Sequence, residues 1–390
     1  MITVEEALAH LFSLVRPLGA ETVPLSEAAG RVLAEDAIAG RDQPPFAASA
    51  MDGYAVRQSD VATGATLQVI GEAAAGHGFD GSVATGQTVR IFTGAPVPEG
   101  ADRVIIQEDV TRAGDQITLG DNLSKGPHIR AAGADFKIGD HLKAPRLLGP
   151  SDIALLASMN LAEITVARQP EVALISTGDE LVMPGEDPGP DQIIASNTFG
   201  LKALLEQHGA RARILPIARD NRPALEAAFA LAEGADLVIT IGGASVGDHD
   251  LVGQVAADLG VEQAFYKVKM RPGKPLMAGR MGEAAMVGLP GNPVSAIVCG
   301  HVFLRPMLRA MLGLDAGPVP RHTARLAVDL GENGPREHYM RADVQDGTIT
   351  PEDSQDSALL SVLAHANALM IRPPDDGPRK AGEQIEYIAL

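Results

Sequence analysis

Between residues 171 and 312, short apolar runs alternate with stretches whose apolar residues recur at helical spacing. Runs rich in Val, Ile and Leu are typical of buried strands. The expected strands lie at 172–176, 213–217, 237–241, 265–270 and 286–289, and the expected helices at 197–208, 223–232 and 293–312. Because strand–helix–strand units wind in one sense, this alternation predicts a doubly wound, mostly parallel α/β domain. Pro306 would kink the last helix unless that helix ends earlier.

The residues before this region follow other patterns. Thr3 and Glu6 form a capping box at the start of an amphipathic helix that reaches Val15. Shorter helices are expected at 26–29 and, capped by Ser151, at 152–159. Frequent glycines between residues 61 and 143 separate short runs and predict an inserted β domain. Its expected strands lie at 66–70, 88–92, 103–107 and 116–119.

A second β pattern begins near residue 320 and predicts a small, barrel-like C-terminal domain. Its expected strands lie at 323–330, 338–344, 346–350, 368–372 and 384–388. The chain is therefore expected to have four domains. They are an N-terminal helical and linker domain, discontinuous at 1–42 and 144–169, an inserted β domain at 43–143, the α/β domain at 170–315 and a C-terminal β domain at 316–390.

Charge and composition narrow the functional classes. The 390 residues carry a formal net charge of −18, which repels nucleic acids and anionic membrane surfaces. Trp is absent, so base-stacking surfaces are not expected. Cys299 is the single cysteine, which excludes a disulfide within the chain, and its apolar neighbours indicate a packed side chain. The sequence shows no signal-peptide pattern, and we expect no apolar span of about 18 residues that could cross a membrane. It therefore predicts a cytoplasmic protein that binds neither membranes nor nucleic acids.

Three of the expected strands end in glycine turns, at Gly242-Gly243, Pro272-Gly273 and Pro290-Gly291. Glycine lets backbone N–H groups approach an anion, and a helix N-terminus adds further donors. The middle turn is surrounded by cations without an acid, at Lys267, Lys269, Arg271, Lys274 and Arg280. Each turn alone is equally well explained as a chain reversal, and the cations as a solubilising edge. Together they favour a site for a phosphate or a similar oxyanion.

Acidic residues follow several of the expected strands, at Glu180, Asp220, Asp248 and Asp250. Since the carboxyl ends of parallel strands converge, two or three of these acids could hold Mg²⁺ beside a bound phosphate. For any one acid, a helix cap or a solvated loop charge is the more common role. His249 lies between two of them, and a lone histidine in a polar loop is more often solvated than a ligand.

Six motifs stand in order along nearly the whole chain. They are SAMDGYAV at 49–56, TGAPVP at 93–98, STGDEL at 176–181, GGASVG at 242–247, RPGKP at 271–275 and GLPGNPVS at 288–295. Alone, Asp52 in the first motif indicates a β-turn, and Thr93 in the second a turn cap or a ligand contact. As an ordered set, the motifs resemble the MoeA family, molybdopterin molybdenumtransferase, which is related to the E domain of gephyrin.

The resemblance implies a Mg²⁺-dependent transferase that inserts molybdate into adenylylated molybdopterin, releases AMP and so completes the molybdenum cofactor. It implies a homodimer of four-domain subunits. In that dimer the inserted β domain of one subunit would face the α/β domain of the other across the active-site cleft. The implied protein partners are molybdopterin adenylyltransferase and the molybdoenzymes, or their chaperones, that receive the cofactor.

The resemblance also assigns functional positions. Those implied as catalytic are Asp52, Thr93, Asp135, Glu180, Asp220 and Asp250, with Asp220 and Asp250 as metal ligands. Those implied to bind substrate are Gly242, Gly243, Ser245, Lys267, Arg271, Lys274, Pro275, Pro290, Pro293 and Arg341, with Ser357 and Ser361 competing for one serine position. The sequence departs from the family pattern at Ala134, where an acid is usual, and Arg130 stands alone where arginines are often more frequent. Arg271 stands where lysine is common and keeps the charge.

Two other functions fit parts of the sequence. A molybdopterin-binding scaffold would keep the fold without turnover, but the acids and the basic loop argue for catalysis. A molybdopterin adenylyltransferase resembles residues 171–312, but the flanking β domains and the segment Met51–Tyr54 disfavour it. Turnover of adenylylated molybdopterin and consumption of ATP would separate the three functions.

Overall fold

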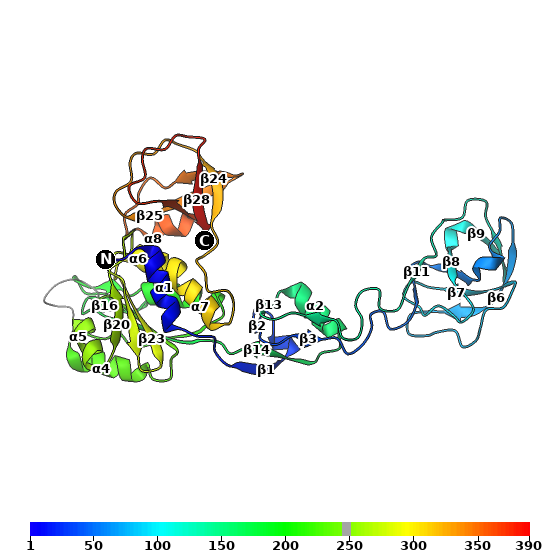
Figure 1. The fold of residues 1–390 in the computed structure, drawn as a ribbon, viewed down its shortest axis with the longest axis horizontal. Helices are drawn as coiled ribbons and strands as arrows, with labels where there is room; N and C mark the ends of the chain where they lie inside the picture. The colour runs from blue at the N-terminus through cyan, green and yellow to red at the C-terminus, as the bar shows by residue number, and fades with distance from the viewer. Residues whose placement is uncertain (244–250) are drawn as a thin grey trace. The chain divides into compact units, whose positions relative to one another are not determined.

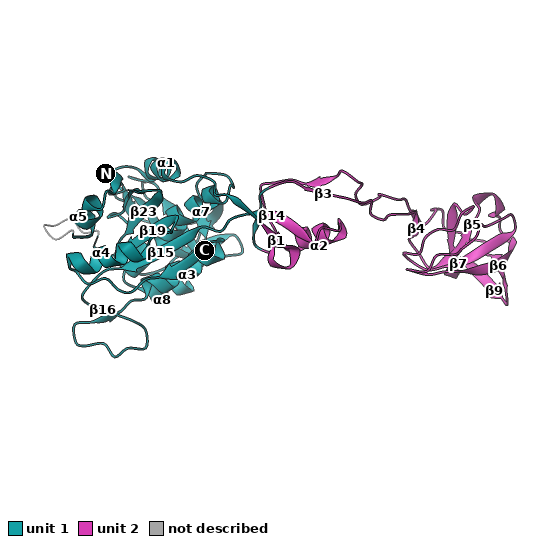
Figure 2. Ribbon diagram, turned by 90° about the horizontal axis from the view of Figure 1, so that it is seen from below, with its two compact units in different colours: residues 1–21, 30–34, 166–390 teal, residues 22–29, 35–165 magenta. Residues whose placement is uncertain are grey.

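A computed structural model describes residues 1–243 and 251–390. By their internal contacts the residues divide into two compact units (Figure 2). Unit 1 comprises Met1–Glu21, Gly30–Ala34 and Val166–Leu390, and unit 2 comprises Thr22–Ala29 and Glu35–Thr165. Each unit contains its own clusters of buried apolar side chains, as separately folding regions do.

A six-stranded sheet forms the centre of unit 1 (Figure 1). Its order is β18 (Arg211–Ile214), β15 (Glu171–Ser176), β19 (Leu237–Ile241), β23 (Ala284–Leu289), β22 (Met277–Met281) and β20 (Glu262–Tyr266). The first four strands are parallel, and β22 runs antiparallel to both of its neighbours. The inner parallel strands β15, β19 and β23 are buried along nearly their whole length, which explains their continuous apolar runs. The expected doubly wound, mostly parallel domain is confirmed.

Helices cover both faces of this sheet, because the two faces carry separate hydrophobic clusters. One cluster includes the buried residues of α3 and α6, and the other includes those of α4 and α5. The bounds are α3 (Asn197–Gln207), α4 (Arg222–Leu231), α5 (Leu251–Asp258) and α6 (Pro293–Cys299). The helices α4 and α6 each have a proline in their first turn, where no intrahelical N–H bond is lost.

The helix expected at 293–312 passes Pro306 by changing its winding. Helix α6 continues through a π-helical turn at Gly300–Leu304 into α7 (Arg305–Met311). Proline lacks an N–H group, and its ring clashes with a carbonyl one turn earlier. The wider π turn accommodates both effects, so the helix does not end before Pro306.

This continuous stretch, Pro293–Met311, is long and apolar enough to cross a membrane by length and composition, contrary to the expectation that no such span exists. Its most apolar window has a mean hydropathy of 1.2, and 78% of that window is buried inside the protein. A helix that is apolar on all sides and buried belongs to the core of its domain. Cys299 is fully buried within it, and this burial raises the pKa of the thiol, as expected for a packed side chain.

The N-terminal helix α1 (Val4–Leu14) packs on the α/β sheet. The Thr3 hydroxyl accepts from the Glu6 N–H, and the Glu6 carboxylate accepts from the Thr3 N–H, which confirms the capping box. The buried stripe of α1 joins the cluster that contains Phe265 of β20 and Ala278 of β22. This helix is therefore not part of the separate N-terminal domain expected for it, because the α/β edge covers its apolar face. The other expected domain boundaries stay predictions.

The C-terminal part of unit 1 is a closed five-stranded barrel, as predicted. Its order is β25 (Glu337–Gln345), β26 (Thr348–Pro351), β24 (His322–Leu326), β28 (Gln384–Ala389) and β27 (Ala368–Arg372), and β27 closes the barrel by pairing with β25. The expected strand at 265–270 is wrong, because it divides at Lys267, whose φ of 67° interrupts an extended chain. Its second part, β21 (Met270–Arg271), pairs with β25 of the barrel. A short helix, α8 (Leu360–His365), was not expected.

Unit 2 is mostly β structure. Its main sheet has the order β8 (Arg103–Ile106), β5 (Gly53–Val56), β7 (Gln87–Ile91), β6 (Thr66–Ala73), β10 (Gln116–Leu119) and β9 (Val110–Ala113). Two short ladders pair β4 (Ala48–Ser49) with β11 (Ile129–Arg130) and β3 (Ala37–Ile38) with β12 (His141–Leu142). The main sheet confirms the expected strands of the inserted β region.

The segments expected as an N-terminal helical domain contain short strands as well as helices. They form a sheet in the order β1 (Ala20–Pro24), β14 (Glu163–Ala167), β2 (Val32–Leu33) and β13 (Arg146–Leu147). Helix α2 (Pro150–Ser158) begins after Gly149 instead of Ser151, and the Gly149 N–H donates to the Asp152 carboxylate. The helix expected at 26–29 is a single 3₁₀ turn at Leu25–Glu27. These short elements lack the length from which helical spacing can be recognised.

Replacing Leu11 by Ala tests the packing of α1. Leu11 is 0% exposed, so the change should lower the free energy of unfolding of unit 1 by about 3 kcal/mol, measured by urea denaturation. Leu259→Ala is the control, because Leu259 is 45% exposed. Equal midpoints for the two variants would show that α1 does not belong to this core.

Candidate functional site

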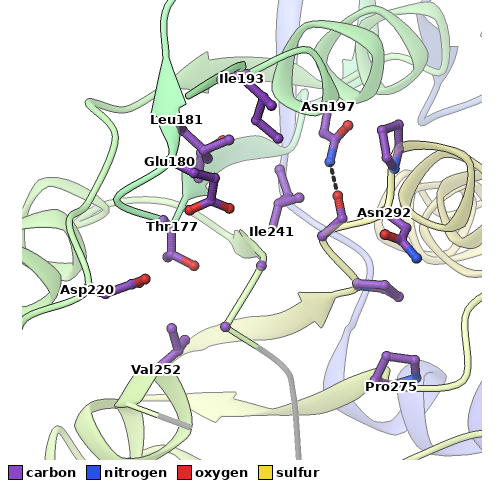
Figure 3. Close-up of a pocket in the computed structure, with 18 of the residues that line it drawn as sticks. Thr177, Glu180, Leu181, Ile193, Asn197, Asp220, Ile241, Val252, Pro275 and Asn292 are labelled. Atoms are coloured by element: carbon purple, nitrogen blue, oxygen red, sulfur yellow. Dashed lines mark hydrogen bonds between the residues drawn. The ribbon is translucent and has the colours of Figure 1, made fainter. Parts of the chain in front are cut away.

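A cavity of about 1150 Å³ lies at the carboxyl edge of the α/β sheet, where β15, β19 and β23 end (Figure 3). The turns after these strands contribute Thr177, Gly242 and Pro290 to its lining. Open α/β sheets bind their ligands at this edge, and cavities of hundreds of cubic ångströms suit small molecules. Sequence-predicted site residues that line the cavity are Glu180, Asp220, Gly242, Gly243, Lys267, Lys274, Pro275, Pro290 and Pro293.

The glycine turn after β19 lies against the neighbouring turn. Gly242 has a φ of 94°, and its N–H donates to the Leu289 carbonyl over 3.2 Å. A Cβ atom at Gly242 would lie 2.7 Å from the Thr177 carbonyl oxygen, closer than such atoms can approach. Glycine is thus required twice at this position, for its backbone conformation and for space. Ser245 and the acids Asp248 and Asp250 follow this turn, together with His249, and all four lie outside the described residues.

Two lysines on the loop between β20 and β22 form the basic part of the lining. The Lys267 N–H donates to the Leu276 carbonyl over 2.8 Å, and its Nζ lies 4.8 Å from the centre of the Tyr266 ring. The Lys274 carbonyl accepts from the N–H groups of Val268 and Leu276. These bonds hold the backbone that carries both cations. The positive φ at Lys267 is uncommon for a residue with a side chain and is often found at functional sites.

Carboxylates occupy another part of the cavity. The Asp220 N–H donates to the Asp179 carboxylate over 3.1 Å, and Arg219 donates to the carbonyls of Asp179 and Leu181. Burial raises the pKa of Asp220, and the charges of Asp179 and Glu180 raise it further. Negative charge is therefore concentrated in this part of the cavity. No group of three metal-ligating side chains occurs within residues 1–243 and 251–390.

An apolar wall and an asparagine complete the lining (Figure 3). The wall includes Leu181 and Ile193, from the paired short strands β16 (Leu181–Val182) and β17 (Ile193–Ile194). Asn197 donates from Nδ2 to the Gly291 carbonyl over 2.7 Å and so ties α3 to the turn after β23. Sequence reasoning missed Asn197, which has no local pattern that distinguishes it from other helix residues. It also missed the buried Thr177, because only Glu180 of the motif at 176–181 was singled out.

Four predicted residues near the C-terminal barrel are not part of the lining. Arg271 is exposed and lies in register with His338 of β25, while Arg341 is fully buried. The Ser357 hydroxyl accepts from Nδ2 of Asn292, a lining residue, over 3.0 Å. The Ser361 carbonyl accepts from His365 within α8. Ser357 is thus the serine connected to the cavity.

Three predicted catalytic residues belong to unit 2. One carboxylate oxygen of Asp52 accepts from the Thr93 N–H over 2.7 Å and from the Thr93 hydroxyl over 2.8 Å. These two bonds lower the pKa of Asp52. The bonds thereby join the motif at 49–56 to the motif at 93–98. Asp135 is exposed, and its N–H donates to the Gln43 carbonyl.

The chain matches three family models that together span most of its length. They are the MoeA N-terminal region (domain I and II) over residues 2–160, the probable molybdopterin binding domain over 173–310 and the MoeA C-terminal region (domain IV) over 323–390. It is 37% identical over 395 residues to the molybdopterin molybdenumtransferase of Haemophilus influenzae, covering 99% of this chain and 98% of that protein. The chain belongs to the MoeA family.

Other MoeA relatives agree over the same length. The molybdopterin molybdenumtransferase of a Nostoc species is 35% identical over 410 residues, covering 100% of this chain and 94% of that protein. A crystal structure of a MoeA protein from Pyrococcus horikoshii is similar with a TM-score of 0.84 and 30% identity, covering 100% of this chain and 99% of that one. The resemblance seen in the six MoeA motifs and the expected multidomain architecture are therefore confirmed.

Replacing Gly242 by Ala tests the close contact at the cavity. The variant gains a left-handed backbone strain and a clash with the Thr177 carbonyl, so its free energy of unfolding should fall by about 3 kcal/mol. Gly260→Ala is a matched control, because Gly260 has a φ of 87° with open space around it. It should lose about 1 kcal/mol. A loss at Gly242 no larger than at Gly260 would contradict the steric argument.

The pKa of Asp52 is open to a direct test. Thr93→Val removes the hydroxyl donor but keeps the N–H, so the pKa of Asp52 should rise towards its ordinary value of 3.8. Carboxyl NMR titration measures the change, with exposed Thr118→Val of the same sheet as control. Because the folded-state pKa is lowered, the bonds stabilise the fold above pH 3.8 and lose this effect as the pH falls through the lower value. An unshifted titration in Thr93→Val would rule out the hydroxyl's contribution.

Proposed function

We propose that this chain is a molybdopterin molybdenumtransferase, which inserts molybdate into adenylylated molybdopterin and releases AMP. The observation that carries the proposal is one cavity that combines Lys267 and Lys274 with two carboxylates, Glu180 and Asp220, in a chain of net charge −18. Relatives of the same length carry this function in their names. An anionic substrate needs local positive charge to approach such a protein.

The cationic residues suit the two anionic substrates. A lysine is a compact charge that fits a tetrahedral oxyanion, and backbone N–H groups of the glycine turns can approach a phosphate. We assign molybdate to Lys274, Arg271 and Arg341, with backbone donors near Pro275. Ser357 is the favoured serine, because it contacts Asn292 at the cavity, whereas Ser361 bonds within α8. The remaining lining residues from the turns, Gly242, Gly243, Pro290 and Pro293, would surround the larger substrate.

The acidic part of the cavity fits a Mg²⁺ ion. Asp220 has a raised pKa because burial and the carboxylates of Asp179 and Glu180 destabilise its charged form, and a divalent cation would relieve this repulsion. Asp220 and, by the family resemblance, Asp250 would hold the ion. When bound, Mg²⁺ would supply positive charge against the phosphoanhydride of the substrate. Glu180 would position the substrate or a water molecule, as would Asp52.

The residues of unit 2 enter this proposal through a homodimer. We assign Asp52, Thr93 and Asp135 to the cleft formed with the α/β domain of a second subunit, as the family resemblance implies. The Asp52–Thr93 pair would then present one oriented carboxylate. We further propose a cytoplasmic location. Molybdopterin adenylyltransferase and cofactor-receiving molybdoenzymes, or their chaperones, are the proposed partners.

The deciding experiment is turnover of adenylylated molybdopterin with molybdate and Mg²⁺, followed as release of AMP. Formation of molybdenum cofactor with one AMP per substrate is the expected result. ATP consumption with metal-free molybdopterin would instead identify an adenylyltransferase. Binding of the substrate without release of AMP would identify a scaffold.

Lys274→Ala separates binding of molybdate from folding. We expect the molybdate concentration for half-maximal activity to rise about tenfold or more, because one charge-assisted contact with the oxyanion is lost. The midpoint of thermal unfolding should change little, since Lys274 is exposed. Lys269→Ala is the matched control, an exposed lysine of the same loop outside the cavity lining. An unchanged molybdate dependence of Lys274→Ala would contradict the assignment.

A further inference from the structure

Arg341 of β25 is a cation without access to solvent. Its side chain is 0% exposed, although it carries five N–H donors. Nη2 donates to the carbonyls of Ser354 and Asp356, each over 3.0 Å. Nε and Nη1 are buried and have no hydrogen-bond partner within the described part of the chain. A buried guanidinium keeps its charge, so these unpaired donors are costly until an anion meets them.

Residues 352–358, here termed the lid segment, contact Arg341 through Ser354, Gln355 and Asp356. This segment lies between β26 and α8 and supplies both carbonyls that accept from Nη2. On the other side, β25 pairs with β27 in the closed barrel, with Arg341 opposite Leu369. A barrel strand is held by ladder bonds on both edges, whereas the lid segment belongs to no strand or helix. The lid segment is therefore the part that can move.

Gln355 holds the lid segment in place. Its Oε1 accepts from the Arg341 N–H, and its Nε2 donates to the carbonyls of Arg341 and Glu352, each over 2.9 Å. The Glu352 N–H also donates to the Arg341 carbonyl. One amide side chain thus replaces the backbone partners that a further strand would provide. Lifting the segment breaks the two bonds between Gln355 and Arg341, so removing these bonds should make lifting easier.

The far end of the lid segment reaches the cavity. Ser357 accepts from Asn292 through its hydroxyl and from the Val294 N–H through its carbonyl, over 3.0 and 3.1 Å. Ala358 lines the cavity, as does Asn292, which is labelled in Figure 3. Movement of the segment would therefore open Arg341 towards the place where substrates are proposed to bind.

We propose that residues 352–358 form a lid over Arg341, that Gln355 is its positioning residue, and that a tetrahedral oxyanion reaches Nε and Nη1 only after the lid opens. This inference rests on the proposed function in naming molybdate as the oxyanion. It explains how a sealed arginine takes part in binding. It also assigns a role to Gln355, which the family motifs do not mark.

Binding kinetics test the order of events. Molybdate is mixed with the full-length chain, and binding is followed by tyrosine fluorescence, since Tyr339 lies two residues from Arg341. If opening precedes binding, the observed rate constant reaches a plateau as molybdate concentration rises. Gln355→Met removes the two Gln355 bonds to Arg341 and the one to Glu352 at similar side-chain volume, and it should raise the plateau about tenfold. Gln345→Met, at an exposed position of β25, should leave the plateau unchanged.

Amide hydrogen exchange gives a readout without ligand. Peptides spanning 352–358 should exchange about tenfold faster in Gln355→Met than in the original chain or in Gln345→Met. Gln355→Asn, whose shorter amide cannot reach all three partners, is the second variant should Gln355→Met unfold. It should move the plateau and the exchange in the same direction.

The outcomes for the lid and for the proposed function are separable. The lid would be overturned if the observed rate constant rose linearly with molybdate concentration. It would also be overturned if the Gln355 variants changed neither the hydrogen exchange nor the plateau. Either result would count even in a chain that turns over adenylylated molybdopterin. A plateau that rises in the Gln355 variants, in a chain without turnover, would support the lid and overturn the proposed enzyme activity. Failure of the original chain to bind molybdate would overturn both.

Discussion

The close approach of backbone to backbone at the carboxyl edge of the α/β sheet is the constraint on which the site depends. Parallel pairing places the ends of β15, β19 and β23 side by side. The turn after β19 then lies so near the turn after β15 that no side-chain carbon fits at Gly242. Because no side chain separates the two turns, their backbones lie in direct contact, and the lysines and acids are arranged around them.

The cavity contains positive side chains although the chain as a whole is negatively charged. A net charge of −18 disfavours anions, yet Lys267 and Lys274 line the cavity. Glu180 and Asp220 are held on separate turns, and Arg219 binds the carbonyls of Asp179 and Leu181. Cations and carboxylates can therefore act on different parts of one substrate. Such a division suits a molecule that carries both a phosphoanhydride and a site for an incoming oxyanion.

The barrel extends the site beyond the α/β sheet. The two-residue strand β21 leaves the basic loop and pairs with β25, so that Arg271 and Arg341 belong to neighbouring strands. Closure of the barrel removes free strand edges and keeps β25 fixed. In the proposed lid, β25 holds the cation Arg341 in a fixed position, and the lid segment, held by side-chain bonds, is the part that moves.

Sequence alone determined the features that repeat along the chain or stand in fixed order. A continuous apolar run predicted β19, and apolar residues at a period of 3.6 predicted α1. The ordered motifs identified the family. Tertiary structure decided which distant groups meet. Packing placed α1 on the α/β sheet, buried Arg341, brought Asn197 to Gly291 and connected Ser357 instead of Ser361 to the cavity. It also set the raised pKa of Asp220, because burial and neighbouring charges depend on contacts that no local pattern contains.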